Sequence, residues 1–172
     1  MADKETRSAK ETAGESVDAL LRALRDEFDI TRKDAAYKLG KLKDPEAVPA
    51  LISALRDKNK LVRDNAVFAL AEIGDRRAVQ PLIDVLSGDS EGRVRKSAAK
   101  GLGILVDKRA EPPLIDALSD NDPTVRKSAA RSLGQLRSRE ALSALEKTLR
   151  DPDILVRKYA HIAIEQIRQS VK

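Results

Sequence analysis

An arginine recurs along the chain at a nearly constant interval, and this recurrence constrains the fold more than any other feature. The arginines are Arg32, Arg63, Arg95, Arg126 and Arg157. They are separated by 31, 32, 31 and 31 residues. An aspartate precedes each arginine by six residues, at Asp26, Asp57, Asp89, Asp120 and Asp151. A fixed period of this length is typical of repeat arrays, so we expect five copies of one structural unit.

Apolar residues within each unit predict two helices. Two leucines spaced by four precede the arginine and mark one face of a first helix. They are Leu20, Leu51, Leu82, Leu114 and Leu145, followed by Leu24, Leu55, Leu86, Leu118 and Leu149. Counted from the arginine, apolar residues at +3, +7 and +10 form the stripe of a second helix. These are alanine at +3, and leucine or isoleucine at +7 and +10.

Capping and turn residues separate the predicted helices. Segments such as Asp120–Pro123 favour a tight turn inside a repeat. Gly74 suits a left-handed helix end, and Asp44-Pro45 suits the start of a following helix. We therefore expect a flexible leader over residues 1–14 and a single repeat domain over 15–172. The expected repeats cover approximately 15–44, 45–75, 76–107, 108–138 and 139–172.

At residues 78–83 (AVQPLI) and 125–130 (VRKSAA) the sequence resembles the HEAT-repeat family, in particular the short repeats of phycobilisome lyase subunits. The resemblance extends over about residues 17–169. It implies an all-α fold, a right-handed α-solenoid (alpha-alpha superhelix) of about five HEAT-like hairpins. It also implies that the recurring aspartates and arginines form a structural ladder between neighbouring repeats. The alternative is that the five arginines form a cationic ladder for phosphates.

The variable positions of the second helices are the better candidates for binding. Positions +1, +5 and +9 are spaced by four and should form one stripe on the concave wall. The candidate partner-binding residues on this stripe are Tyr37, Phe68, Lys96, Lys100, Lys127, Arg131 and Lys158. The two aromatics would be anchors at one end and the cations would attract acidic groups along the rest. Gap filling by the aromatics and mere solvation of the cations are the competing interpretations.

Charge is distributed unevenly along the chain. Residues 1–92 carry 16 Lys+Arg and 18 Asp+Glu, whereas residues 93–172 carry 17 and 10. The basic C-terminal half favours a protein partner of acidic character. Nucleic acid is a less favoured alternative, because no aromatics interleave with the cations and acidic residues such as Glu111 and Asp116 dilute the field. A third alternative is a non-catalytic subunit of a larger enzyme such as a lyase.

The residues that support catalysis are scarce, so we do not expect an enzyme. The chain has no cysteine and a single histidine, His161. His161 occupies position +4, where the other repeats have alanine or valine, and is expected to be packed or half-buried. The His-Glu pairs of HEAT-like hydroxylases are absent, as are phosphate-loop and nucleophile-elbow motifs. We expect no cofactor and no metal. Without a membrane span or signal peptide, a cytoplasmic protein is expected.

The last repeat carries apolar residues outside the regular stripe. Tyr159, Ile162 and Val171 occupy positions where a terminal repeat should be polar. They suggest a homo-oligomer contact or a partner at the C-terminal edge, with ordinary capping as the alternative.

Overall fold

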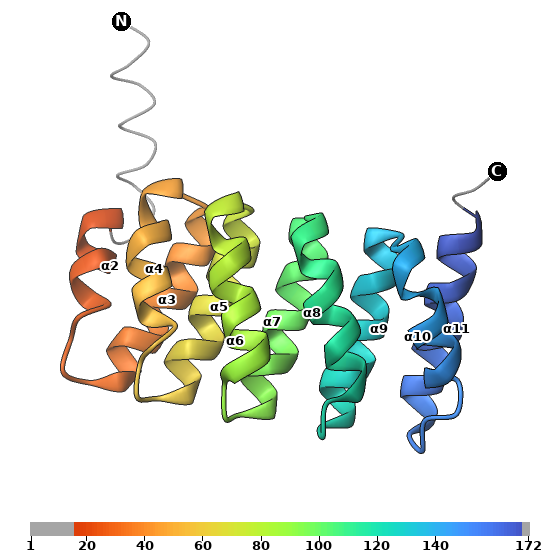
Figure 1. Cartoon of the computed structure of the whole chain (residues 1–172). Helices are drawn as coiled ribbons and strands as arrows, with labels where there is room; N and C mark the ends of the chain where they lie inside the picture. Colours follow the sequence, from red (N-terminus) through yellow and green to blue (C-terminus); the bar gives the residue numbers. More distant parts are fainter. Residues whose placement is uncertain (1–15, 170–172) are drawn as a thin grey trace, which may run out of the picture.

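The computed structural model describes residues 16–169, which form an array of helical hairpins. These residues build ten α-helices and no strand. The hairpins stand side by side from α2 at one end to α11 at the other (Figure 1). The predicted all-α solenoid is confirmed. The predicted leader at residues 1–14, and Val171, lie outside the described residues.

Each hairpin combines a shorter first helix with a longer second helix. The first helices are α2 (Val17–Ala23), α4 (Val48–Ala54), α6 (Val79–Gly88), α8 (Glu111–Asp116) and α10 (Leu142–Thr148). The second helices are α3 (Asp29–Leu42), α5 (Lys60–Ile73), α7 (Gly92–Leu105), α9 (Pro123–Leu136) and α11 (Ile154–Gln169). Short 3₁₀ helices lie at Pro45–Ala47, Arg76–Ala78, Lys108–Ala110, Ala117–Ser119 and Arg139–Ala141.

The helices begin and end where local chemistry favours it. The side chains of Asn59 and Asp122 cap α5 and α9 by accepting backbone N–H bonds. At the ends of four second helices the chain turns through a left-handed residue. These residues are Lys43 (φ 54°), Gly74 (φ 76°), Val106 (φ 49°) and Arg137 (φ 53°). All four lie eleven residues after the repeat arginine, so the repeat geometry imposes this conformation even where glycine is absent.

The core is aliphatic and lies between the two layers of helices. The first-helix leucines Leu51, Leu82, Leu114 and Leu145 are fully buried, as are the second-helix alanines at +3 in the inner repeats. Two members of the predicted apolar stripes are exposed instead, namely Leu42 and Leu149. They belong to the first and last repeats, which have a described neighbouring repeat on one side only. Membership of an apolar stripe therefore does not ensure burial in these two repeats.

The two layers are packed to different densities. Consecutive second helices pack closely, whereas consecutive first helices make few contacts. Small residues permit the close approach: a Cβ added at Gly40 would lie 2.6 Å from the Ala69 Cα, and one at Gly134 would lie 2.9 Å from the Ala163 Cα. Open grooves separate first helices instead, as between α4 and α6. The second-helix layer is therefore the tighter, inner side of the array.

Candidate partner-binding wall

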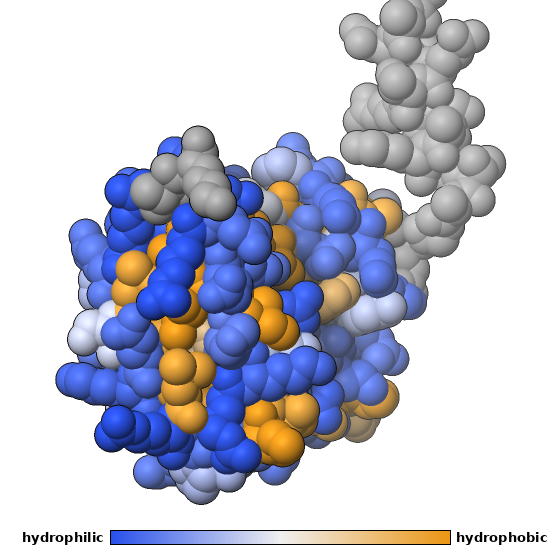
Figure 2. Space-filling view, turned by 90° about the vertical axis from the view of Figure 1, so that its right-hand side faces the viewer, coloured by the Kyte–Doolittle hydropathy of each residue, from blue (hydrophilic) through white to orange (hydrophobic). Residues whose placement is uncertain are grey.

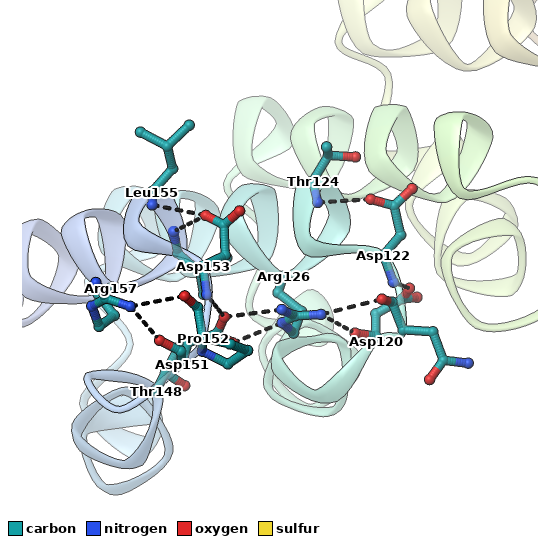
Figure 3. A network of polar contacts seen from close by, with 12 residues as sticks. Asp120, Asp122, Thr124, Arg126, Thr148, Asp151, Pro152, Asp153, Leu155 and Arg157 are labelled. Atoms are coloured by element: carbon teal, nitrogen blue, oxygen red, sulfur yellow. Dashed lines mark hydrogen bonds and ion pairs between the residues drawn. The ribbon is translucent and has the colours of Figure 1, made fainter.

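The recurring arginine joins neighbouring hairpins by bonding in two directions. Arg126 Nε donates to Asp151 Oδ2 at 2.7 Å, and Nη2 donates to Asp151 Oδ1 at 2.9 Å. Its Nη1 donates back to the Asp120 carbonyl at 2.8 Å (Figure 3). Asp151 Oδ1 also accepts the backbone N–H of Asp153, which shapes the turn before α11. A single arginine therefore ties together the turns of two successive repeats.

The same arrangement occurs at all four junctions between the five hairpins. Nε–Oδ2 distances are 2.6 to 2.8 Å and Nη2–Oδ1 distances are 2.8 to 2.9 Å. The pairs are Arg32–Asp57, Arg63–Asp89, Arg95–Asp120 and Arg126–Asp151. Bidentate geometry of this kind is among the stronger charge-assisted contacts in proteins.

The ladder holds its aspartates in the ionised form. Hydrogen bonds from the arginine lower the pKa of Asp57, Asp120 and Asp151, and backbone N–H donors add to the effect. Burial opposes ionisation most strongly at Asp89, but the bonds from Arg63 and from the Glu91 N–H still lower its pKa. These side chains are mostly buried and already paired, which leaves little capacity for binding external phosphates.

The ladder is open at both ends of the described array. Arg157 donates through Nη1 to the carbonyls of Asp151 and Pro152, and no described aspartate pairs with its Nε and Nη2. At the other end, Asp26 Oδ1 accepts the Phe28 N–H, and no described repeat precedes the first hairpin to supply a ladder arginine. The two ends thus present complementary groups.

The predicted aromatic anchors form one stacked cluster on the second-helix wall. The rings of Tyr37 and Phe68 lie 5.5 Å apart at 17°. The Lys41 Nζ lies over both rings, 5.4 Å from one centroid and 5.2 Å from the other. Tyr37 is 45% exposed and Phe68 is half-buried. The aromatics therefore form a shared apolar platform bearing a positive charge.

The predicted cations occupy the rest of the stripe along α7, α9 and α11. Lys100, Arg131 and Lys158 are exposed, whereas Lys96 and Lys127 are half-buried. None of these five has a carboxylate partner among the ion pairs of the described residues. The wall is therefore apolar and aromatic at its N-terminal part and basic further along.

Asp64 occupies the stripe position that the other repeats fill with lysine, and it is almost buried. Its carboxylate accepts a bond from Arg93 Nε at 2.6 Å and another from Ser97 Oγ at 2.5 Å. The negative charge is thus neutralised within the fold, between the aromatic platform and the lysines. The sequence analysis did not predict these bonds, because they join residues of two different repeats.

His161 is exposed, so the expectation that it is packed or half-buried was wrong. In the other repeats position +4 is buried against the following hairpin. The fifth hairpin has no described neighbour on that side, which leaves the imidazole uncovered. The described residues contain no group of three or more His, Asp or Glu side chains suited to a metal ion. None of their helices is long and apolar enough to cross a membrane.

Fold and wall together define a helical-repeat protein with an inner surface of mixed aromatic and basic character. The sequence pattern of HEAT repeats matches residues 17–103 and, overlapping them, residues 79–168. The chain belongs to the HEAT-repeat family. A comparison with curated protein sequences finds no match.

Several solved structures share the fold. In the complex of CpcE and CpcF of phycocyanin lyase from Nostoc sp. PCC7120, one chain is 29% identical with a TM-score of 0.81. The match covers 91% of this chain and 66% of that chain, so the present sequence spans just under two thirds of that chain's length. An engineered protein is 26% identical with a TM-score of 0.66, covering 89% of this chain and 79% of its own. A designed armadillo repeat protein in complex with the peptide (KR)4 is 22% identical with a TM-score of 0.62, covering 88% and 81%.

Proposed function

We propose that this chain is a non-catalytic binding module whose second-helix wall holds an acidic segment of a partner protein. The observation that carries the proposal is the continuous stripe from the Tyr37–Phe68 platform to Lys100, Arg131 and Lys158. Exposed aromatic rings supply apolar contact area at low entropic cost, and grouped cations raise the local positive potential.

The repeat spacing specifies the kind of segment that fits. Neighbouring packed helices are about 8–10 Å apart, and an extended chain rises about 3.3 Å per residue. One repeat of the wall therefore corresponds to roughly three residues of an extended partner. We infer that the partner places acidic residues at this interval along α7, α9 and α11, with an apolar residue on the aromatic platform at α3 and α5.

The similarity to a subunit of the CpcE–CpcF complex supports the proposal, since that protein assembles with another chain. It also supports a second candidate, that this chain is a non-catalytic subunit of a larger enzyme such as a lyase. Both candidates require a protein partner on the array, and they differ in whether the resulting assembly has activity.

Peptide binding tests the proposed wall. A fluorescent peptide with glutamate at roughly every third position and one leucine-rich end should bind in fluorescence anisotropy. Reversing two charges in Lys100→Glu/Arg131→Glu should weaken binding at least about tenfold. A peptide of the same composition in scrambled order should bind more weakly than the designed peptide, because its carboxylates no longer match the repeat spacing.

Charge reversals on the outer layer provide the matched control. Arg22 on α2 and Lys147 on α10 are exposed on first helices, so Arg22→Glu/Lys147→Glu changes net charge equally but leaves the wall intact. Equal loss of binding in both double variants would show a general charge effect and reject the wall.

A basic wall also raises the alternative of nucleic-acid binding. Duplex DNA should then be retained at physiological salt, with an affinity that falls steeply as salt rises. Stronger retention of duplex DNA than of the acidic peptide would favour this alternative over a protein partner.

A further inference from the structure

We propose that the two ends of this array bind each other in successive copies of the chain, head to tail. In this arrangement the fifth hairpin of one copy stacks on the first hairpin of the next, as a sixth repeat would. The contact uses the outward faces of α11 and α2–α3, and of the candidate wall residues it includes Tyr37 and Lys158. The proposal does not rest on the proposed function, because the residues whose substitution tests it, Phe28 and Ile154, lie outside the wall.

The inference rests on a fixed register between neighbouring repeats. The arginine of one repeat pairs with the aspartate at −6 of the next. Counted from the repeat arginine, position −3 of one repeat contacts position −4 of the next. The example is the ion pair between Lys60 Nζ and Glu91 Oε2 at 3.2 Å. Position +1 contacts position +2 of the next repeat, as in the bond between Asp64 and Ser97. Position +8 faces position +6 of the next repeat, as Gly40 faces Ala69. This register states which residues would meet if a second copy followed the fifth hairpin.

The ladder would be completed by this contact. Among residues 16–169 no carboxylate pairs with Arg157 Nε and Nη2, and the register places Asp26 of the next copy opposite them. Asp26 already accepts the Phe28 N–H through Oδ1. The aspartates at the four internal junctions accept the same type of turn bond while binding arginine. The incoming group is thus preorganised for its role.

Exposed apolar residues at the two ends also fall opposite each other. The register pairs Ile154, at −3, with Phe28, at −4. Their exposures are 69% and 62%, among the highest of the large apolar side chains in the described array. It also pairs Ile162 with Tyr37, following the stacking of Tyr37 on Phe68. Figure 2 shows the C-terminal end of the array, where apolar side chains gather in a band between hydrophilic ones.

Charged residues at the ends are complementary in the same register. Lys158 at +1 meets Asp34 at +2, which also pairs with Lys33 of its own chain at 3.3 Å. At the +8 and +6 positions, the long side chains of Glu165 and Lys38 fall opposite each other. The last pair is bulkier than the internal glycine and alanine pairs, so the second helices must separate further there. These positions lie about 10 Å along the helix from the ladder, and a small tilt about the ladder end provides the space.

One position does not match. Lys43 pairs with Glu72 at 3.1 Å inside the array, and the equivalent residues across the ends are Arg168 and Lys41. Both are exposed, and Arg168 already pairs with Glu146 at 3.0 Å. Repulsion between exposed, solvated charges is weak, so this mismatch is outweighed by the ladder and apolar contacts. Because the contact is heterologous, it generates open chains of copies rather than closed dimers.

Two edge variants test the proposal without disturbing the fold. Ile154→Asp blocks the C-terminal edge and Phe28→Asp blocks the N-terminal edge. Aspartate is favourable at both sites, since Ile154 begins α11 and Phe28 is the N-cap of α3. In sedimentation velocity the unmodified chain should show a mass that rises with concentration beyond a dimer. Each variant alone should be monomeric, with association weakened at least about tenfold.

Mixing the two variants gives the decisive result. One intact edge remains on each chain, so the mixture should form a 1:1 heterodimer and nothing larger. Ile104→Asp is the matched control, because Ile104 is 55% exposed but lies in the middle of the array, and it should associate like the unmodified chain. A monomeric unmodified chain, a dimer insensitive to Phe28→Asp, or the absence of a heterodimer would each overturn the proposal.

Discussion

Val106 holds a left-handed backbone conformation that a β-branched residue rarely adopts. Its φ is 49°, whereas the equivalent residue of the second repeat is Gly74 with φ 76°. The Val106 side chain is 57% exposed and contributes little to the core. This residue therefore stores backbone strain without compensating burial.

Replacing Val106 by glycine should stabilise the protein. Relief of the left-handed strain outweighs the greater flexibility of glycine in the unfolded chain, and the free energy of unfolding should rise by about 1 kcal/mol. Urea denaturation followed by circular dichroism measures the change. The reciprocal variant Gly74→Val should be destabilised by a similar or larger amount. If Val106→Gly lowers stability, the strain argument is wrong.

Single residues show where sequence reasoning reaches its limit. Tyr37 and Phe68 could be placed on one stripe because they share a repeat position. The role of Lys41 over both rings was missed, although its position at +9 was the available signal. His161 was misjudged because burial at +4 depends on the next repeat rather than on the helix that carries it. The burial of a side chain that faces a neighbouring hairpin can be predicted only in part from the sequence of its own repeat.

Between helices, the arginine ladder provides a directed link whose strength can be compared within one molecule. Arg126→Ala removes a bidentate pair and leaves Asp151 mostly buried without its arginine, so the loss should be about 2–4 kcal/mol. Arg157→Ala removes bonds to backbone carbonyls only and should lose about 1 kcal/mol. Chemical denaturation of both variants gives the comparison. Normal stability of Arg126→Ala together with lost peptide binding would overturn the structural role of the ladder.

Close packing of the second helices yields a second comparison. A Cβ at Gly134 would approach the backbone of Ala163, so Gly134→Ala should destabilise by about 1–3 kcal/mol. Gly88, at the end of α6, has nothing within 4 Å of the added Cβ. Gly88→Ala should be neutral or stabilising by up to about 1 kcal/mol, since alanine favours helix. Equal effects in thermal melts would contradict the difference between the layers.

The helices themselves were predictable because the apolar period and the capping residues are local signals. The 31-residue recurrence further predicted that equivalent helices stack. The packing density of each helix layer was harder to predict from the sequence, although the small residues at positions +6 and +8 indicate close packing of the second helices. The bonds of Asp64 with Arg93 and Ser97 could not be predicted from the repeat pattern, because Asp64 stands at a position where the other repeats have lysine.

Across the whole molecule, the ladder couples stability to pH. Arginine bonds lower the folded-state pKa of Asp57, Asp120 and Asp151, and Asp89 is also lowered despite its burial. Arg109 and its backbone N–H lower the pKa of Asp107 to about 2. An aspartate whose pKa is lower in the folded state than in the unfolded state stabilises the fold at pH values above its unfolded pKa of about 3.9. This stabilisation is lost as the pH falls through the folded-state pKa.

We therefore expect stability to be constant above about pH 5 and to decline steadily as pH falls from about 4 towards 2. Urea midpoints measured at several pH values test this. The variant Asp120→Asn should be less stable at pH 7, but it should lose less on acidification because one ladder group no longer titrates. An unchanged acid slope in this variant would show that the ladder does not carry the dependence.

The difference between the two layers has a mechanical consequence. The tightly packed second helices act as an inextensible spine, whereas the grooves between first helices can widen or narrow with little change in contact. Bending about the spine should therefore be the softest deformation of the array. A ligand along the spine would meet a nearly constant spacing of side chains, while the overall arc could adjust to the length and shape of what it holds.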